Sequence, residues 1–418
     1  MVTAAAPSAL LPTVRWSWLW SRRSDLAWTF LPFWLALPLV AILYAARDLG
    51  GAADNPVWNF TLGGRHIHLL GFVMYFYGPL VDAPHLWATI ARTYTDREEW
   101  ATRRRLFLGS LVWFFVGPAV ILLPYVVHAL MPSRASEDSI GWVLWSNFFT
   151  FYALFHINKQ HWGFIALYKR KNGDLADSRE NRADQLFFYS AIWLPYVAML
   201  TAPWYADFDG RPFRLLQAPV LGTTLGAALH VLCHVAFFTV CAVYGAFQLG
   251  RFRQGLPRNG PKLAYVATVI PLYYLAFSIH PLIAAFWVLL TGVGHCAQYH
   301  RVVWAYGQTK YAHKAEQDRR LPSTIFEKAW LYAVLGVAYG IVTLQGPGSS
   351  FAKAWMASAM DLSLFSRCFP FLDHAGSLEL GIKVAAAFIS GVRLHHFYVD
   401  SKIWRVSKSA ALARNLNV

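Results

Sequence analysis

Histidines are the residues of this chain whose type and spacing point most clearly to chemistry. The chain of 418 residues holds 15 of them. Several stand in three short segments, with the sequences FHINKQHW (155–162), HCAQYH (295–300) and HHFYVD (395–400). Neutral imidazole binds Fe, Cu, Zn and Ni, and ionisable side chains within an apolar chain are costly and usually functional. The segments therefore predict a transition-metal site built from histidines.

Helical geometry decides which histidines can share one metal. His230 and His234 are four residues apart and lie about 40° apart around a helix, so both could bind one ion. The histidines of the first two segments are five residues apart, or about 140°, and the adjacent pair of the third is separated by about 100°. Three explanations are open for each of these pairs. One histidine binds the metal and the other only supports the site, or the helix unwinds there, or the site is wide enough to take both.

Two carboxylates lie within helical reach of a histidine. Asp82 precedes His85 by three residues and Asp400 follows His396 by four, so each could orient its imidazole or ligate directly. The predicted metal ligands are His85, His156, His161, His230, His234, His295, His300, His395 and His396, and the sequence does not identify a catalytic residue. The other histidines are predicted to be polar groups near the membrane interface: His66, His68, His128, His280, His313 and His374.

The elements that carry these residues are predicted to be membrane helices. The chain is 56% hydrophobic and 14% charged, with a mean hydropathy of +0.36, whereas a soluble domain carries roughly 25% charged residues. Its net charge of +15 is scattered in short clusters between apolar stretches, as in loops that flank membrane spans. We therefore expect no nucleic-acid partner. The four cysteines show no disulfide framework.

About ten stretches are long enough to cross a bilayer, which takes roughly 20 apolar residues. Their approximate ranges are 26–46, 67–90, 106–130, 140–168, 184–202, 221–249, 263–279, 281–306, 326–345 and 377–398. We therefore predict an all-α, polytopic membrane helix bundle that forms a single domain over residues 1–418.

The basic residues predict how the spans are oriented. Most of the 37 Lys and Arg fall in alternate connecting segments, which places both termini in the cytoplasm. We expect the bacterial inner (plasma) membrane. In this topology the second, fourth, eighth and tenth spans bring seven histidines towards the cytoplasmic side, while His230 and His234 lie in the sixth span, nearer its outer half.

The segments HINKQHW, HCAQYH and HHFYVD resemble the histidine boxes of integral-membrane non-haem iron enzymes, the fatty-acid desaturase/hydroxylase and alkane monooxygenase group. Those enzymes are similar in placing histidine clusters at the cytoplasmic ends of membrane helices. The resemblance implies a mono- or di-iron enzyme with these ligands: His156, His161, His295, His300, His395 and His396. A second resemblance is to polytopic, histidine-ligated bacterial carotenoid-cleaving dioxygenases.

The sequence thus predicts a membrane-embedded polyhistidine oxidoreductase that oxygenates or desaturates a lipid-soluble substrate. One or two iron ions are the expected cofactor, although copper and zinc also suit imidazole. The expected partners are membrane lipids, a hydrophobic small molecule and an electron-donor protein. Two alternatives stay open. Histidines on facing helices can ligate haem b in an electron-transfer cytochrome, or can handle protons without metal in a proton-coupled transporter.

Overall fold

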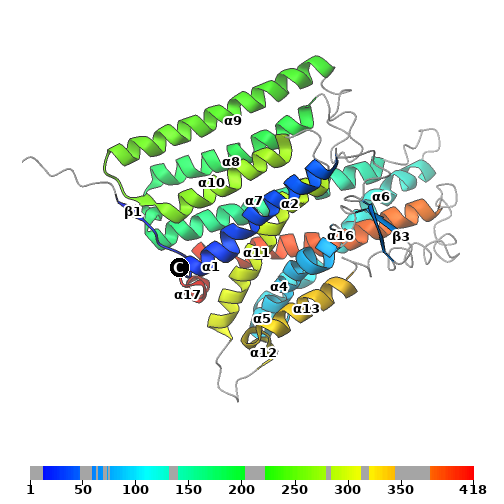
Figure 1. Cartoon of the computed structure of the whole chain (residues 1–418). Coiled ribbons are helices and arrows are strands. Elements are labelled where there is room, and N and C mark those ends of the chain that lie inside the picture. Colours follow the sequence, from blue (N-terminus) through cyan, green and yellow to red (C-terminus); the bar gives the residue numbers. More distant parts are fainter. Residues whose placement is uncertain are drawn as a thin grey trace, which may run out of the picture.

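A computed structural model of the chain describes residues 13–47, 59–62, 65–68, 73, 76–130, 140–202, 222–278, 284–311, 320–343 and 377–418. Nearly all of the secondary structure in this part is helical, which confirms the all-α prediction (Figure 1). His280, His313 and His374 lie outside the described residues.

The helices follow one another in the order expected for the spans. They are α1 (Arg22–Asp25), α2 (Leu31–Arg47), α4 (Ala83–Thr93), α5 (Arg97–Ser110), α6 (Trp113–Leu130), α7 (Ile140–Asn172), α8 (Ser178–Thr201), α9 (Gly222–Arg253), α10 (Gly260–Ser278), α11 (Ala284–Lys310), α12 (Leu321–Glu327), α13 (Ala329–Val342), α16 (Ser377–Ile403) and α17 (Ala410–Leu416). Two π-helical segments, η1 (Leu26–Phe30) and η2 (Gly78–Asp82), lead directly into α2 and α4. A short parallel pairing joins β1 (Val14–Arg15) to β4 (Arg258–Asn259).

Several helices are long and apolar enough to cross a membrane. Within the described ranges, four meet this test, with mean hydropathies of 1.2 to 2.3: Arg22–Ala45, Arg97–His128, Ile140–Asn172 and Leu225–Arg253. The pair α12 and α13, bent by 107°, meets it jointly and gives a fifth only if the two helices form one broken span. The chain is therefore compatible with a membrane protein, and the count of ten spans and the cytoplasmic position of the termini stay predictions.

The structure differs from the sequence prediction at the start of the second span. The segment Arg65–His68 is strand β3, which pairs antiparallel with β2 (Asn59–Leu62), so the helix expected from residue 67 does not begin there. The described helix runs instead through η2 and α4 to Thr93. Three of the four residues of β3 are Arg or His, whose burial in hydrocarbon is costly, and this favours a hairpin outside the apolar layer.

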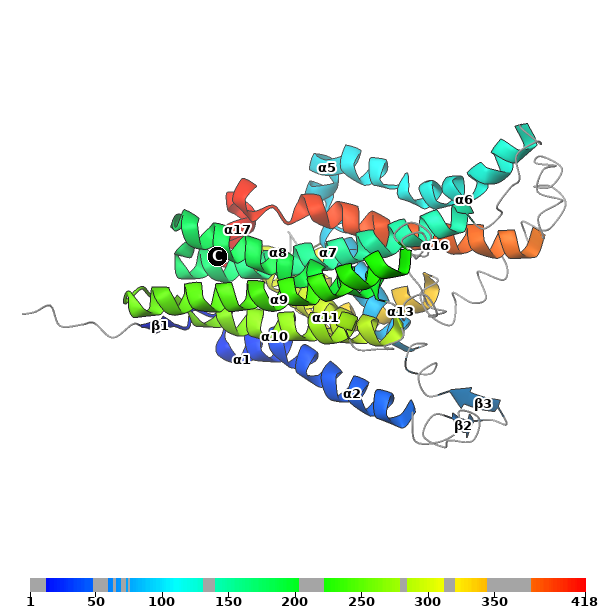
Figure 2. The same ribbon diagram turned by 90° about the horizontal axis from the view of Figure 1, so that it is seen from above.

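The long helices pack in layers. Helices α9, α8 and α10 lie side by side in Figure 1, with α8 in contact with both neighbours. On the other side α6 packs along α16 and α13 packs along α4, while α11 lies between and contacts α2, α4, α7 and α10. Figure 2 shows that most of these helices run in a similar direction. Residues near the middle of several helices can therefore meet at one level.

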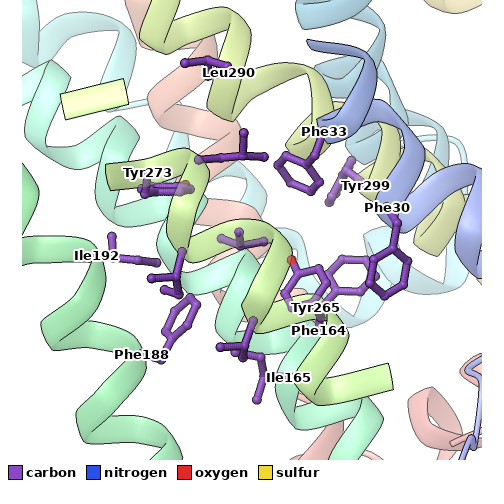
Figure 3. Packing of buried hydrophobic residues seen from close by; sticks show 14 of the residues in the cluster. Phe30, Phe33, Phe164, Ile165, Phe188, Ile192, Tyr265, Tyr273, Leu290 and Tyr299 are labelled. Atoms are coloured by element: carbon purple, nitrogen blue, oxygen red, sulfur yellow. The ribbon is translucent and has the colours of Figure 1, made fainter. Parts of the chain in front are cut away.

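Aromatic side chains fill the space between α2, α7, α10 and α11 (Figure 3). Tyr265 is fully buried there, with its ring centroid 6.1 Å from that of Phe30 and 6.0 Å from that of Phe164. Helices α2 and α11 approach so closely that a Cβ atom on Gly294 would lie 2.2 Å from the ring of Phe33. Glycine at position 294 therefore lets α11 pack closely against α2. His295, of the second segment, is the next residue.

Charged residues are also buried, where α7, α8 and α10 meet. Nζ of Lys262 lies 2.6 Å from Glu180 and 3.0 Å from Asp184, and Lys169 pairs with the same Asp184. All four side chains are nearly inaccessible to solvent. Breaking such a buried pair costs roughly 3–5 kcal/mol, because an uncompensated charge stays behind. Lys169, near the basic C-terminal end of α7, thus helps to hold α7, α8 and α10 together, in addition to any role in membrane orientation.

Candidate metal centre

Four helices each bring one histidine to the same buried place. These residues are His85 of α4, His156 of α7, His295 of α11 and His396 of α16, all less than a tenth exposed. One ring nitrogen of each of His85, His156 and His396 lies within 4.8 Å of those of the other two. The ring centroid of His295 is 5.1 Å from that of His85 and 5.2 Å from that of His156. We call these four residues the histidine cluster.

Each member of the histidine cluster has one buried ring nitrogen without a hydrogen-bond partner among the described residues. These atoms are Nε2 of His85, His156 and His396 and Nδ1 of His295. An unsatisfied buried polar atom costs roughly 1–3 kcal/mol, so four of them in one place are expensive unless a ligand satisfies them. Nitrogen donors from several helices are a ligand set that suits Fe, Cu, Zn or Ni. The residues present therefore fit a transition metal.

The backbone fixes the orientation of His85. Its Nδ1 lies 2.5 Å from the carbonyl oxygen of Asp82. Because a carbonyl only accepts hydrogen bonds, Nδ1 carries the proton and Nε2 keeps its lone pair for a metal. The Asp82 carboxylate lies 3.6 Å from the same Nδ1 and is ion-paired with Arg393. The couple expected from the three-residue spacing is thus present, and Asp82 orients the histidine.

Thr89 is the centre of the network that holds His396. Its hydroxyl lies 2.7 Å from Nδ1 of His396 and donates to Oδ1 of Asp400 at 2.8 Å. Since its proton goes to Asp400, the hydroxyl accepts from Nδ1–H, and Nε2 of His396 keeps its lone pair. Tyr299 donates to the same Oδ1 at 2.7 Å. The other oxygen, Oδ2, is buried 3.6 Å from Nε2 of His396 and has no hydrogen-bond partner among the described residues.

The predicted pairs are divided between the histidine cluster and its surroundings. In α11 the second histidine, His300, contacts the hydroxyl of Tyr332 of α13 at 2.9 Å. In α16 the neighbour of His396, His395, contacts the hydroxyl of Tyr94 at 3.0 Å. The helices stay regular, so residues about 100° or 140° apart must face different neighbours. Of the alternatives, the structure shows one member of each pair at the cluster and the other beside it.

His161, the second histidine of α7, is also buried but lies outside the histidine cluster. Its ring centroid is 6.5 Å from that of His295, and its Nδ1 lies 2.7 Å from the hydroxyl of Tyr265. Tyr265 donates to Oε1 of Gln298, whose amide donates to the carbonyl of Thr29. This chain of donors leaves the proton of His161 on Nδ1 and a lone pair on Nε2, which is buried and has no partner in the described part.

His230 and His234 form a separate pair on α9. Their ring centroids are 4.6 Å apart, as the four-residue spacing predicts. Nδ1 of His230 lies 2.8 Å from the carbonyl of Ala198 of α8, and Nδ1 of His234 lies 3.2 Å from the hydroxyl of Tyr274 of α10. The structure does not bring them to the histidine cluster.

His156 lies nearer the middle of its helix than the sequence suggested. His156 is the middle residue of α7, because this helix continues as far as Asn172. A cavity of about 620 Å³ begins beside the cluster and follows α7, α11 and α16 outwards. The buried residues His156, Tyr299, Phe397 and Asp400 line it beside the cluster, and its wall is largely apolar. This volume lies within the 300–1,000 Å³ typical of small-molecule sites.

Polar contacts at the helix ends hold α4, α11 and α16 together. The buried guanidinium of Arg92 lies 3.7 Å from the ring centroid of Trp404, just after α16. Asp96, just after α4, accepts hydrogen bonds from Lys310 at 2.7 Å and from Tyr311 at 2.5 Å. Burial raises the pKa of Asp96, but these two donors and the Lys310 charge outweigh it, so the net pKa lies below the usual value for Asp.

The hydroxyl and amide groups that hold the histidines were not predicted from the sequence. Thr89 was detectable, because it follows His85 by four residues and so shares its face of α4. Tyr265, Tyr94 and Tyr332 carried no such signal, since they are three of 20 tyrosines and each contacts its histidine from a different helix. The hydrogen bond from Tyr265 to Gln298 likewise could not be predicted, because it depends on the packing of α10 against α11.

Comparisons with known protein families, with curated proteins and with solved structures found no match for this chain.

Proposed function

We propose that this protein is a membrane-embedded polyhistidine metal enzyme that oxygenates or desaturates a lipid-soluble substrate. The observation that carries the proposal is the histidine cluster, in which four buried imidazoles from four helices each have one ring nitrogen without a described partner. The adjoining cavity gives an apolar molecule access to the same place. The proposal includes the topology of the sequence analysis, with about ten spans and the centre reached from the cytoplasmic side.

Iron is the metal that this setting favours. Imidazoles with one nearby carboxylate, Asp400, are the donor types of non-haem iron sites, which keep positions open for reactants. When bound, non-haem iron supplies the electron chemistry that lets O₂ attack an unreactive C–H bond. In oxygenation one oxygen atom enters the substrate and the other leaves as water; in desaturation the substrate loses two hydrogens and both oxygen atoms leave as water. Either reaction takes two electrons and two protons from a donor.

The residues around the cluster have separate tasks in this proposal. His85 and His396 are held as neutral ligands by the Asp82 carbonyl and by Thr89. Phe397 stacks on His156 with 4.3 Å between ring centroids and shields it from water. The apolar wall of the cavity binds and orients the substrate chain beside these ligands.

The geometry favours a non-haem centre over haem b. Ring centroids of His85 and His396 are 4.7 Å apart, and those of His156 and His396 are 5.0 Å apart. Axial ligands of a haem stand on opposite faces of a wide planar macrocycle, and rings in direct contact leave no room for one. His230 and His234 lie on one face of a single helix and so cannot ligate one haem from both sides.

The test uses neighbouring histidines as matched pairs. Protein purified in mild detergent, without a metal-affinity step, is analysed for metals by mass spectrometry together with an optical spectrum. We expect one or two irons per chain without a Soret band. His396→Ala should lower the bound iron by roughly tenfold or more, whereas His395→Ala on the same helix should retain it.

Three outcomes would overturn the proposal. A Soret band would indicate a cytochrome, and the absence of metal after reconstitution would favour proton or substrate handling by a transporter. Equal iron in the His395 and His396 variants would refute the site.

With iron present, reduced protein incubated with O₂ and membrane lipid should yield a lipid product with one added oxygen or two fewer hydrogens.

A further inference from the structure

The cavity beside the histidine cluster has two chemically different ends. The buried residues His156 and Asp400 line the part that we call the inner end, and the exposed arginines Arg170 and Arg405 line the part that we call the outer end. Asp400 is the one acidic residue among those that line it, and it stands at the inner end. The outer end therefore has a net positive charge.

The two arginines at the outer end are available to an anion. Arg405 uses Nε to donate to the carbonyl of Ser401, which orients its guanidinium and leaves the terminal nitrogens for a ligand. No ion pair with a described residue is formed by either arginine. Lys159, the other basic residue of the wall, stands over the rings of Phe155 and Tyr189 instead, at 5.3 and 5.1 Å from their centroids.

The length of the cavity matches one lipid chain. His156 and Arg170 lie on the same helix, α7, and are separated by about 21 Å at 1.5 Å rise per residue. Half of a bilayer's hydrocarbon core, the depth that one leaflet occupies, is about 15 Å. The groove is thus long enough for an extended alkyl chain along its apolar wall plus a head group beyond it.

We propose that the cavity binds an amphiphile with one anionic group on a long alkyl chain. The anion, a carboxylate or a phosphate, binds Arg170 and Arg405, and the chain lies along α7 with a carbon far from the head group beside His156. This inference rests on the proposed function, because it names the substrate class of that centre. It also sets the position of reaction, since the arginines hold the chain at a fixed depth.

Glycine in the groove offers a way to block it. A Cβ atom on Gly163, which lines the cavity midway between His156 and Arg170 of α7, would meet no other atom within 4 Å. Gly163→Leu therefore places its side chain in the cavity from a position that has room for the Cβ atom. Gly245→Leu is the matched control, because Gly245 is also helical and an added Cβ atom there would meet no other atom within 4 Å, but it is exposed and lies on α9.

The experiment measures binding of tritiated hexadecanoate to the detergent-purified chain, with competition by hexadecyl phosphate and by hexadecanol. We expect hexadecanol to bind at least tenfold more weakly than the better anion. Changing Arg170 and Arg405 together to Gln should lower hexadecanoate affinity about tenfold or more and leave hexadecanol unchanged. Arg104→Gln, at an exposed position of α5, should change nothing. Gly163→Leu should weaken all three ligands.

The outcomes separate this inference from the proposed function. Tighter binding of the phosphate assigns a phospholipid-type head group, and tighter binding of hexadecanoate assigns a free fatty acid; both support the proposal. Equal affinity for the alcohol, or no effect of the two arginines, overturns it even when iron is bound. Arginine-dependent binding by a chain that holds no metal would keep the groove assignment and refute the proposed function.

Discussion

Replacing Thr89 by Val removes one hydroxyl from the network behind the histidine cluster and almost preserves shape. The hydroxyl lies 2.6 Å from the Tyr299 hydroxyl, 2.7 Å from Nδ1 of His396 and 2.8 Å from Oδ1 of Asp400. In Thr89→Val, Nδ1–H of His396 loses its described acceptor, while Asp400 keeps the hydrogen bond from Tyr299. The main loss therefore falls on the orientation and protonation of one ligand.

The size of the effect follows from similar supporting groups in metal sites. Removing a partner that orients a ligating histidine lowers metal affinity by about 10–100-fold, which corresponds to about 1.4–2.8 kcal/mol. The unfolding free energy of the metal-free chain should fall by about 1–3 kcal/mol, because a buried donor is left unsatisfied.

Iron affinity would be measured by competition with chelators of graded strength, and stability by thermal unfolding of the metal-free protein. Thr93→Val is the matched control, since Thr93 is equally buried in α4 but donates to the backbone carbonyl of residue 89 at 2.6 Å. We expect iron affinity to fall in Thr89→Val and to stay within twofold in Thr93→Val. Identical iron affinities in the two variants would show that the hydroxyl does not support a ligand.

Three further predictions concern the helices that carry the centre. Gly391→Ala should destabilise the chain by about 1–3 kcal/mol in denaturant unfolding, because its Cβ would lie 2.6 Å from the backbone of α6, whereas Gly109→Ala meets nothing within 4 Å and should not. Lys262→Met should cost about 1–3 kcal/mol, because two buried carboxylates of α8 each lose one of their two basic partners, and an equal loss in the exposed Lys408→Met would contradict this. The lowered pKa of Asp96 means that its ionised form stabilises the fold above pH about 3.9, and this contribution is lost as the pH falls through the lower folded-state pKa. The stability difference between wild type and Asp96→Asn should therefore be constant from pH 7 to 5 and shrink below about pH 4, and a difference that shrinks near neutral pH would contradict it.

Much of the proposed centre could be predicted from the sequence, because the residue types that form it are rare in apolar segments. Histidine and a carboxylate stand out there, so His156, His295 and His396 were identified without knowledge of the fold. The order of the helices also followed from hydropathy. Helical angles predicted that the segment pairs would diverge, and they do.

The choice within each pair could not be predicted, because it depends on which neighbouring helix each face meets. His300 contacts Tyr332 only because α13 packs across that face of α11. The start of the second span was misassigned for a related reason. Hydropathy averages over a window, so the polar and β-pairing character of Arg65–His68 was masked by the apolar residues that follow.

The charge of the proposed centre depends on one carboxylate. Neutral imidazoles leave a divalent ion with both of its positive charges, which an apolar interior opposes. Asp82 cannot offset them, since it is already paired with Arg393. Asp400 has no ion pair with a lysine or arginine in the described part, and its second oxygen lies beside Nε2 of His396. Its negative charge is therefore the one that can balance a metal, so the proposed centre combines histidines with one carboxylate.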